Sequence, residues 1–101
     1  MRISKSNNGK QTTIYVCESI TALNSIELED LITSEIEGGT DDLVIDLSEM
    51  EYTSSAGLRV FIKAQKMIDG KGGKMKVCGA SDFVMEIFSS TGTDIILNIE
   101  Q

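Results

Sequence analysis

The hydrophobic pattern at the start of the chain has the short period of β-strands. Met1–Ser6 alternates loosely, and Gln11–Cys17 is rich in β-branched and aromatic residues. Between them, Asn7-Asn8-Gly9-Lys10 contains an Asn-Gly pair, which suits the positive φ values of a tight turn. The pattern predicts an N-terminal β-hairpin.

The period then changes to that of an amphipathic helix over Ser25–Glu37. Asn24 or Ser25 is expected to be the N-cap, acids occupy the first turn, and Gly38-Gly39 ends the segment. The predicted apolar stripe consists of Ile26, Leu28, Leu31, Ile32 and Ile36.

Two more helices are predicted. Ser55–Asp69 has one mostly apolar face, in which Gln65 is the imperfect member, and a basic face formed by Arg59, Lys63 and Lys66. The other runs from Asp82 to Ser89 or Ser90, with Ser81 as its cap and Thr91-Gly92-Thr93 as its end. The apolar face of the longer helix consists of Leu58, Phe61, Ile62, Gln65 and Ile68.

Three short apolar runs alternate with these helices and predict strands: Leu43–Leu47, Met75–Cys78 and Ile95–Ile99. Leu43–Leu47 is expected to be central and buried on both faces. The order ββαβαβαβ predicts an α/β fold with a mixed, mostly parallel sheet, an N-terminal hairpin and about three to four helices. Residues 1–101 are expected to form a single domain.

Composition excludes several kinds of chemistry. The chain has no histidine, which removes Ser-His catalysis and the commonest ligand of transition metals. Cys17 and Cys78 are expected to be free, buried thiols. We therefore expect no cofactor, no metal and no catalytic residue. No apolar run is long enough to span a bilayer and no signal pattern is present, so we expect a cytoplasmic protein without membrane contact.

Charge is distributed unevenly. The net charge is −7, which argues against nucleic acid as a partner. Residues 11–58 contain eleven acids and neither Lys nor Arg, whereas residues 59–76 contain six bases and one acid, Asp69. This asymmetry either steers a partner or reflects ordinary solvated faces. The six bases are Arg59, Lys63, Lys66, Lys71, Lys74 and Lys76.

The segment 43–58 contains the most specific pattern. An apolar strand runs into Thr53-Ser54-Ser55-Ala56-Gly57, and a helix follows at once. Capping serines are common, and one cap suffices for a helix. Three consecutive hydroxyl residues and a glycine in the first turn, which costs roughly 0.8–1 kcal/mol relative to Ala, indicate in addition the close approach of another backbone or a partner.

At these residues the chain resembles the STAS domain, which is shared by sulfate transporters and bacterial anti-sigma factor antagonists. Its signature is similar to Asp46-Leu47-Ser48 followed by Tyr52-Thr53-Ser54-Ser55-Ala56-Gly57-Leu58. The resemblance covers essentially the whole chain. Two positions depart from the family pattern, because the residue before the family's phosphoacceptor is often Asp and the one after it is often Ser.

The resemblance implies a non-enzymatic anti-sigma factor antagonist (anti-anti-sigma factor) that acts by partner switching. It would bind an anti-sigma factor that is also a serine kinase, would be switched off by phosphorylation of Ser55, and would be restored by a PP2C-type phosphatase. Ser54 and Thr53 are the competing acceptors. The implied partner-binding residues are Asn24, Thr53, Ser54, Ser55, Gly57 and Arg59.

Two alternatives stay open. One is a constitutive STAS subunit of a larger stress-sensing or lipid-transport assembly, which works without phosphorylation. The other is a small hydrolase with Ser55 as nucleophile, against which the absence of histidine argues. The sequence is compatible with a monomer or a weak dimer.

Overall fold

The computed structural model describes residues 1–100 and confirms the α/β class. Its five-stranded sheet has the order β1-β2-β3-β4-β5, in which β1 and β2 are antiparallel and the later neighbours are parallel. The elements are β1 Ile3–Asn8, β2 Gln11–Val16, α1 Asn24–Glu37, β3 Asp42–Asp46, α2 Ser55–Gly70, β4 Lys74–Cys78, α3 Asp82–Thr91, α4 Thr93–Ile96 and β5 Ile99–Glu100.

The predicted hairpin is present. Asn8 pairs with Gln11 across a two-residue turn, and Gly9 has a φ of 66°, a conformation that glycine adopts without a steric penalty. The third strand was predicted as Leu43–Leu47, and the structure places it one residue earlier, as β3 Asp42–Asp46.

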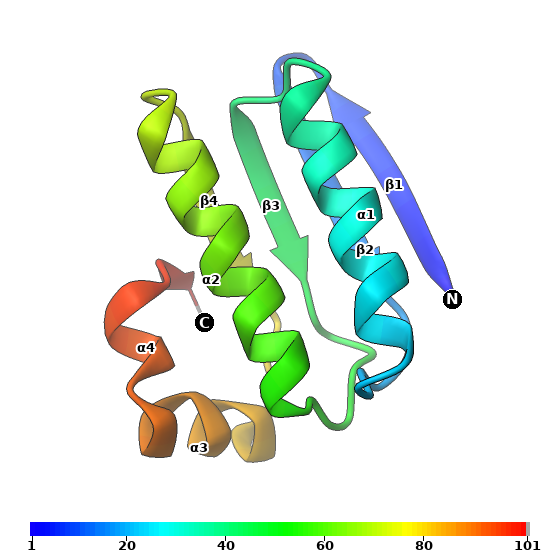
Figure 1. The fold of residues 1–101 in the computed structure, drawn as a ribbon, viewed down its shortest axis with the longest axis vertical. Helices are drawn as coiled ribbons and strands as arrows, with labels where there is room; N and C mark the ends of the chain where they lie inside the picture. The colour runs from blue at the N-terminus through cyan, green and yellow to red at the C-terminus, as the bar shows by residue number, and fades with distance from the viewer. Residues whose placement is uncertain (101) are drawn as a thin grey trace.

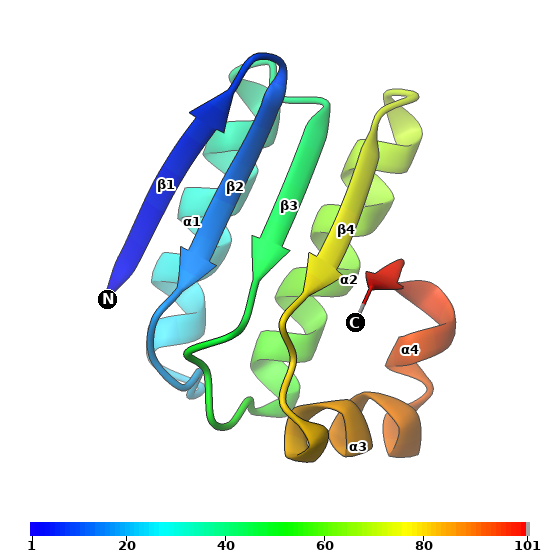
Figure 2. The ribbon, with the colours of Figure 1, turned by 180° about the vertical axis from the view of Figure 1, so that it is seen from behind.

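Helices α1 and α2 lie side by side on one face of the sheet, whereas the opposite face carries no helix (Figures 1 and 2). The core therefore lies between this helix pair and the inward residues of β2, β3 and β4. The prediction that the third strand is central and buried holds for Leu43, Val44 and Ile45. Val44 is buried without a helix above its face, and Thr13 and Lys76 are its neighbours across the strands.

The start of α1 differs from the prediction. Neither Asn24 nor Ser25 is the N-cap; the helix begins at Asn24, and Leu23 flanks it without a capping hydrogen bond. Instead, Thr21 and Asn24 exchange two hydrogen bonds: Thr21 N donates to Asn24 Oδ1 (2.7 Å) and Asn24 N donates to Thr21 Oγ1 (3.2 Å). This reciprocal arrangement is that of a capping box, with Asn in place of Glu or Gln.

The predicted apolar stripe of α1 is partly wrong. Leu28, Ile32 and Ile36 are buried, but Ile26 is 66% exposed and Leu31 is 42% exposed. An isolated apolar residue on a surface is ordinary. Ile26, however, lies in the N-terminal turn of α1, close to the predicted functional segment.

The end of the chain was predicted wrongly. The segment Ile95–Ile99 is not a strand: Gly92, at φ 75°, ends α3 and leads into the short helix α4, and β5 is limited to Ile99–Glu100. In α4, Leu97 N donates to Thr93 O at 3.0 Å. Short apolar runs are ambiguous between helix and strand, and here Ile95 and Ile96 remain largely exposed, so burial does not enforce strand pairing.

Candidate functional site

Two loops meet at the end of the sheet where the parallel strands terminate. An isolated parallel bridge joins Ile20, after β2, to Thr53, before α2. Ile20 N donates to Tyr52 O (3.0 Å), and Ser54 N donates to Ile20 O (2.9 Å). We call residues 51–55 the serine loop. These two hydrogen bonds hold the backbone on both sides of Thr53, and they thereby fix the position of the start of α2.

The three consecutive hydroxyl residues have three different environments. Thr53 is 2% exposed, and its hydroxyl donates to Ser54 O at 3.2 Å. A kinase cannot reach this oxygen in the folded state. Thr53 therefore shapes the loop, and it is poorly placed both as a phosphoacceptor and as a direct partner contact.

Ser54 is the N-cap of α2. Its backbone is extended, and its hydroxyl oxygen accepts a hydrogen bond from Gly57 N at 3.3 Å. Ser and Asp are both strong N-cap residues, so Ser at a position where the family often has Asp retains the cap and removes one negative charge. Ser54 is half-buried, and its oxygen is committed to the helix.

Ser55 is the first residue of α2, and its side chain is exposed. Its hydroxyl makes no hydrogen bond with residues 1–100, in contrast to the two hydroxyls before it. The N-terminal end of a helix favours negative charge. Of the three predicted acceptors, Ser55 is therefore the one that combines access with a favourable local field.

Gly57 is required by close packing within the chain. A Cβ at this position would collide with Thr53 Oγ1 and would lie 2.9 Å from Ile20 Cγ2. The close approach indicated by the sequence is thus that of this protein's own loops. Gly57 is buried, so it positions the first turn of α2 and offers little surface to a partner.

Asn24 also acts within the chain. Besides its bonds to Thr21, its side-chain amide donates to Glu18 Oε1 (3.1 Å) and Ser19 O (3.0 Å). Ser19 Oγ in turn accepts a hydrogen bond from Tyr52 N (3.1 Å). Asn24 therefore connects the loop before α1 to the serine loop, which is a positioning role.

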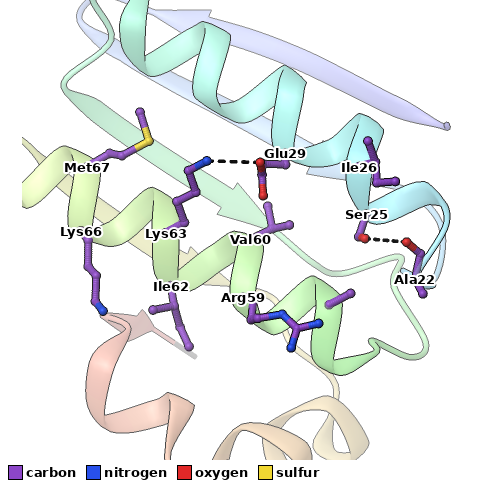
Figure 3. Close-up of a pocket in the computed structure, with 11 residues that line it drawn as sticks. Ala22, Ser25, Ile26, Glu29, Arg59, Val60, Ile62, Lys63, Lys66 and Met67 are labelled. Carbon is purple, nitrogen blue, oxygen red and sulfur yellow. Dashed lines mark hydrogen bonds and ion pairs between the residues drawn. The ribbon is translucent and has the colours of Figure 1, made fainter.

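Arg59 lies one turn after Ser55, is exposed, and forms no ion pair with any of residues 1–100. It stands at the rim of a groove between α1 and α2 (Figure 3). The groove begins at Ala22 and Ala56, directly beside the serine loop, and continues along α2 to Met67.

Sequence reasoning missed an aromatic pair next to the serine loop. Tyr52 and Phe83, from the first turn of α3, stack with ring centroids 6.4 Å apart and an angle of 28° between the planes. Both rings are about half exposed, and Leu23 near the start of α1 is 84% exposed. Tyr52 precedes Thr53 directly, but only the fold brings Phe83 beside it. Exposed aromatic side chains are enriched in protein interfaces.

Asp46, the last residue of β3, makes local contacts through its carboxylate. Its Oδ1 accepts hydrogen bonds from Ser48 N (2.9 Å) and from the Ser48 hydroxyl. Gly79 stands against this pair at φ 74°, where a Cβ would lie 2.9 Å from Ser48 Oγ. The Asp-Leu-Ser part of the signature therefore secures the loop after β3 against the end of β4.

The cysteines and carboxylates of residues 1–100 do not gather into a metal site. Both cysteines are free, and partial burial, reinforced by a nearby carboxylate, raises the pKa of each thiol: Glu49 acts on Cys17 and Asp46 on Cys78. Within residues 1–100 no group of three potential metal ligands forms, and no helix is long and apolar enough to cross a membrane.

Comparison with known proteins identifies the family. The model of the STAS domain matches residues 2–101, so the chain belongs to the STAS domain family. It is 30% identical to BtrV of Bordetella bronchiseptica over 73 residues, and 27% identical to the anti-sigma-B factor antagonist of Staphylococcus aureus over 75 residues. The aligned regions cover 72% and 74% of this chain, 63% of BtrV and 69% of the S. aureus protein.

Solved structures share the fold. TM1081 of Thermotoga maritima superimposes with a TM-score of 0.92 at 19% identity, covering 98% of this chain and 86% of that protein. The Bacillus protein SpoIIAA in its phosphorylated form superimposes with a TM-score of 0.76 at 10% identity, covering 99% and 92%. By distant homology the chain groups with the anti-sigma factor antagonists, which are non-enzymatic regulators.

Proposed function

We propose that this protein is a cytoplasmic anti-sigma factor antagonist controlled by reversible phosphorylation of Ser55. It binds an anti-sigma factor that is also a serine kinase and thereby releases a sigma factor. The kinase phosphorylates Ser55 and ends the complex, and a PP2C-type phosphatase restores the binding form. The observation that carries the proposal is the exposed, unengaged hydroxyl of Ser55 at the start of a helix held by its own loops.

The physical consequence of phosphorylation supports a switch. A phosphate adds about −1.5 to −2 charge at pH 7 and is tolerated at a helix N-terminus. In a docked interface the same charge is desolvated, and a desolvated charge without a partner costs several kcal/mol. Each 1.4 kcal/mol changes an affinity tenfold, so this cost is large enough to dissociate the complex. The fold itself persists, because the phosphate is stabilised at the helix N-terminus.

The binding surface proposed around Ser55 combines polar and apolar residues. Arg59 supplies positive charge, and Tyr52 with Phe83 supplies exposed aromatic surface beside the loop. Thr53, Ser54, Gly57 and Asn24 act behind this surface by fixing the loop and the first turn of α2.

The test is phosphopeptide mapping of the protein from its own cells, grown with and without stress. We expect phosphate on Ser55, with an occupancy that changes with conditions. Phosphate on Ser54 instead would move the acceptor by one residue and require the cap of α2 to open. A serine loop that stays unmodified under every condition would contradict the switch and favour the constitutive subunit of a larger assembly.

A matched pair of variants tests the role of the modification in binding. Ser55→Asp is expected to weaken binding of the anti-sigma factor kinase at least tenfold, whereas Ser55→Ala retains binding and cannot be phosphorylated. Equal affinities for both variants, measured by calorimetry with the purified kinase, would contradict the proposal.

A further inference from the structure

A groove runs between α1 and α2 and begins beside the serine loop. It has a volume of about 850 Å³. Ile26, Val60 and Met67 give it apolar surface, and Ala22 and Ala56 leave room at the end beside the serine loop. Figure 3 shows Val60, Lys63 and Met67 on the side of α2 that faces α1.

The rim of this groove is positively charged in a chain that is otherwise acidic. Arg59, Lys63 and Lys66 lie along α2 at the groove, with Glu29 of α1 as its one carboxylate. Lys63 Nζ contacts Glu29 Oε2 at 3.2 Å, whereas Arg59 and Lys66 form no ion pair or hydrogen bond with any of residues 1–100. Two net positive charges therefore remain for a ligand.

Other cations of the same sequence segment are already engaged. Lys74 pairs with Asp42 (3.8 Å) and Lys76 with Glu100 (3.5 Å). Lys71 Nζ donates to the carbonyls of Ile36 (2.8 Å) and Thr40 (3.2 Å) at the end of α1. In the basic segment after the serine loop, Lys71, Lys74 and Lys76 therefore have partners within the chain. Arg59 and Lys66, at the groove, have none among residues 1–100.

We propose that this groove binds an acidic amphipathic helix of the anti-sigma factor kinase, laid along α2. The proposal deepens the function proposed above and rests on it. Met67 lies eleven residues after Ala56 along α2, so the groove is about 16 Å long at 1.5 Å of rise per residue. This length accommodates about three turns of a partner helix. Apolar side chains of that helix pack on the exposed Ile26 and the half-buried Met67, with the buried Val60 beneath them, as in helix-in-groove recognition.

The spacing of the cations specifies the partner's charges. Arg59, Lys63 and Lys66 stand at i, i+4 and i+7, so acids at similar intervals along one edge of the partner helix face them. The groove is open to solvent along its length, which suits a helix better than a small molecule, since small ligands bury most of their surface. The two free cations of the groove favour an acidic segment, although the chain as a whole carries net negative charge.

The groove adjoins Ser55, so the two sites act together. Arg59 lies four residues after Ser55, within one turn of the helix. A phosphate on Ser55 draws on the same positive charge and repels the acidic edge of the partner helix. Phosphorylation therefore weakens the complex at the groove as well as at the serine loop.

The experiment measures the affinity of the purified anti-sigma factor kinase of the source organism for four variants of the full chain. Lys66→Glu reverses a free cation of the groove, and Lys10→Glu reverses an exposed lysine of the β1–β2 turn that forms no ion pair with residues 1–100. Ile26→Asp places charge in the groove, and Ile95→Asp places it outside the groove, at an isoleucine of α4 that is 86% exposed compared with 66% for Ile26. Circular dichroism checks that each variant is folded.

We expect Lys66→Glu to weaken binding about tenfold at low salt (about 50 mM) and by less than about twofold at about 500 mM, since salt screens rim charges. Ile26→Asp weakens binding about tenfold or more at both salt concentrations. The Lys10 and Ile95 variants bind within about twofold of the wild type.

Failure of this inference is distinguishable from failure of the proposed function. If Ser55→Asp abolishes binding while the Lys66 and Ile26 variants bind normally, the function stands and the groove is not the docking site. If the wild type binds no anti-sigma factor kinase, both fail. Loss of phosphatidylglycerol-vesicle binding, or of self-association in sedimentation, in the Lys66 or Ile26 variants with unchanged kinase affinity would assign the groove to a lipid or a second copy and overturn the proposal.

Discussion

Gly57, in the first turn of α2, lies directly against Thr53 of the serine loop. A Cβ at Gly57 would collide with the Thr53 hydroxyl oxygen and crowd Ile20. Because glycine has no side chain, the bridge between Ile20 and Thr53 can pack under the first turn of α2. This packing holds Ser55 at the surface.

Gly57→Ala is therefore expected to lower the free energy of unfolding by about 2 kcal/mol, even though Ala is intrinsically the better helix residue by about 1 kcal/mol. Urea denaturation measures this change. Gly70→Ala is the matched control, since a Cβ at Gly70 at the end of α2 meets no atom within 4 Å. Equal effects of the two substitutions would refute the packing argument.

Ser54→Ala and Ser55→Ala separate capping from exposure. Loss of the Ser54 hydroxyl removes the bond to Gly57 N and is expected to cost about 1 kcal/mol of stability. Loss of the Ser55 hydroxyl removes no contact within residues 1–100, and stability should change by less than about 0.5 kcal/mol. Chemical denaturation of both variants decides the matter, and a reversed order would mean that Ser55 is the cap.

Ser55→Asp should leave the fold intact and is expected to raise stability by about 0.3–1 kcal/mol, because its charge is next to the positive end of the α2 dipole. Ser89→Asp, near the C-terminal end of α3, should be destabilising by a similar amount. Thermal unfolding compares them at low salt. A destabilised Ser55→Asp variant would show that loss of binding reflects unfolding and not a switch.

Lys71→Met should lower stability by about 1–2 kcal/mol, because Lys71 donates to two carbonyls at the end of α1 and its charge favours that helix terminus. Lys66→Met, which removes an exposed cation without contacts in residues 1–100, provides the comparison. We expect a lower urea midpoint for Lys71→Met than for Lys66→Met, and the difference measures the contribution of the Lys71 hydrogen bonds at the end of α1. Identical midpoints would show that the Lys71 contacts contribute nothing.

Glu35 gives a prediction about pH. The hydrogen bond from the Thr40 hydroxyl (2.9 Å) and the ion pair with Lys5 (3.1 Å) lower the pKa of this carboxyl below its ordinary value of about 4.3, although partial burial opposes them. A lowered folded-state pKa stabilises the protein above the unfolded-state pKa, and this contribution is lost as the pH falls through the folded-state value.

Glu35→Gln should consequently be less stable than the wild type at neutral pH, and the difference should shrink once the pH falls below about 4.3. Denaturation at a series of pH values measures it. Glu37→Gln removes an exposed carboxylate of the same helix and controls for net charge. A difference that does not change with pH would assign the effect of Glu35→Gln to lost packing.

Periodicity determined most of the fold. The hairpin, the three main helices and the two buried strands were predicted from the sequence, because one face of each helix and the strand interiors are strongly apolar. The exception is Ile95–Ile99, where short-range pattern is ambiguous and the conformation depends on Gly92 and on how little of the segment is buried.

For the candidate site, the sequence by itself determined the signature, its place at a helix start and the unequal distribution of charge. Only the tertiary structure decided that Thr53 is buried, that Ser54 caps α2, that Ser55 is exposed, and that Gly57 and Asn24 serve the chain's own packing. The reason is physical: local propensity specifies where a helix begins, whereas exposure and contact depend on Ile20 and Phe83, which are distant in sequence and meet the serine loop only in the folded chain.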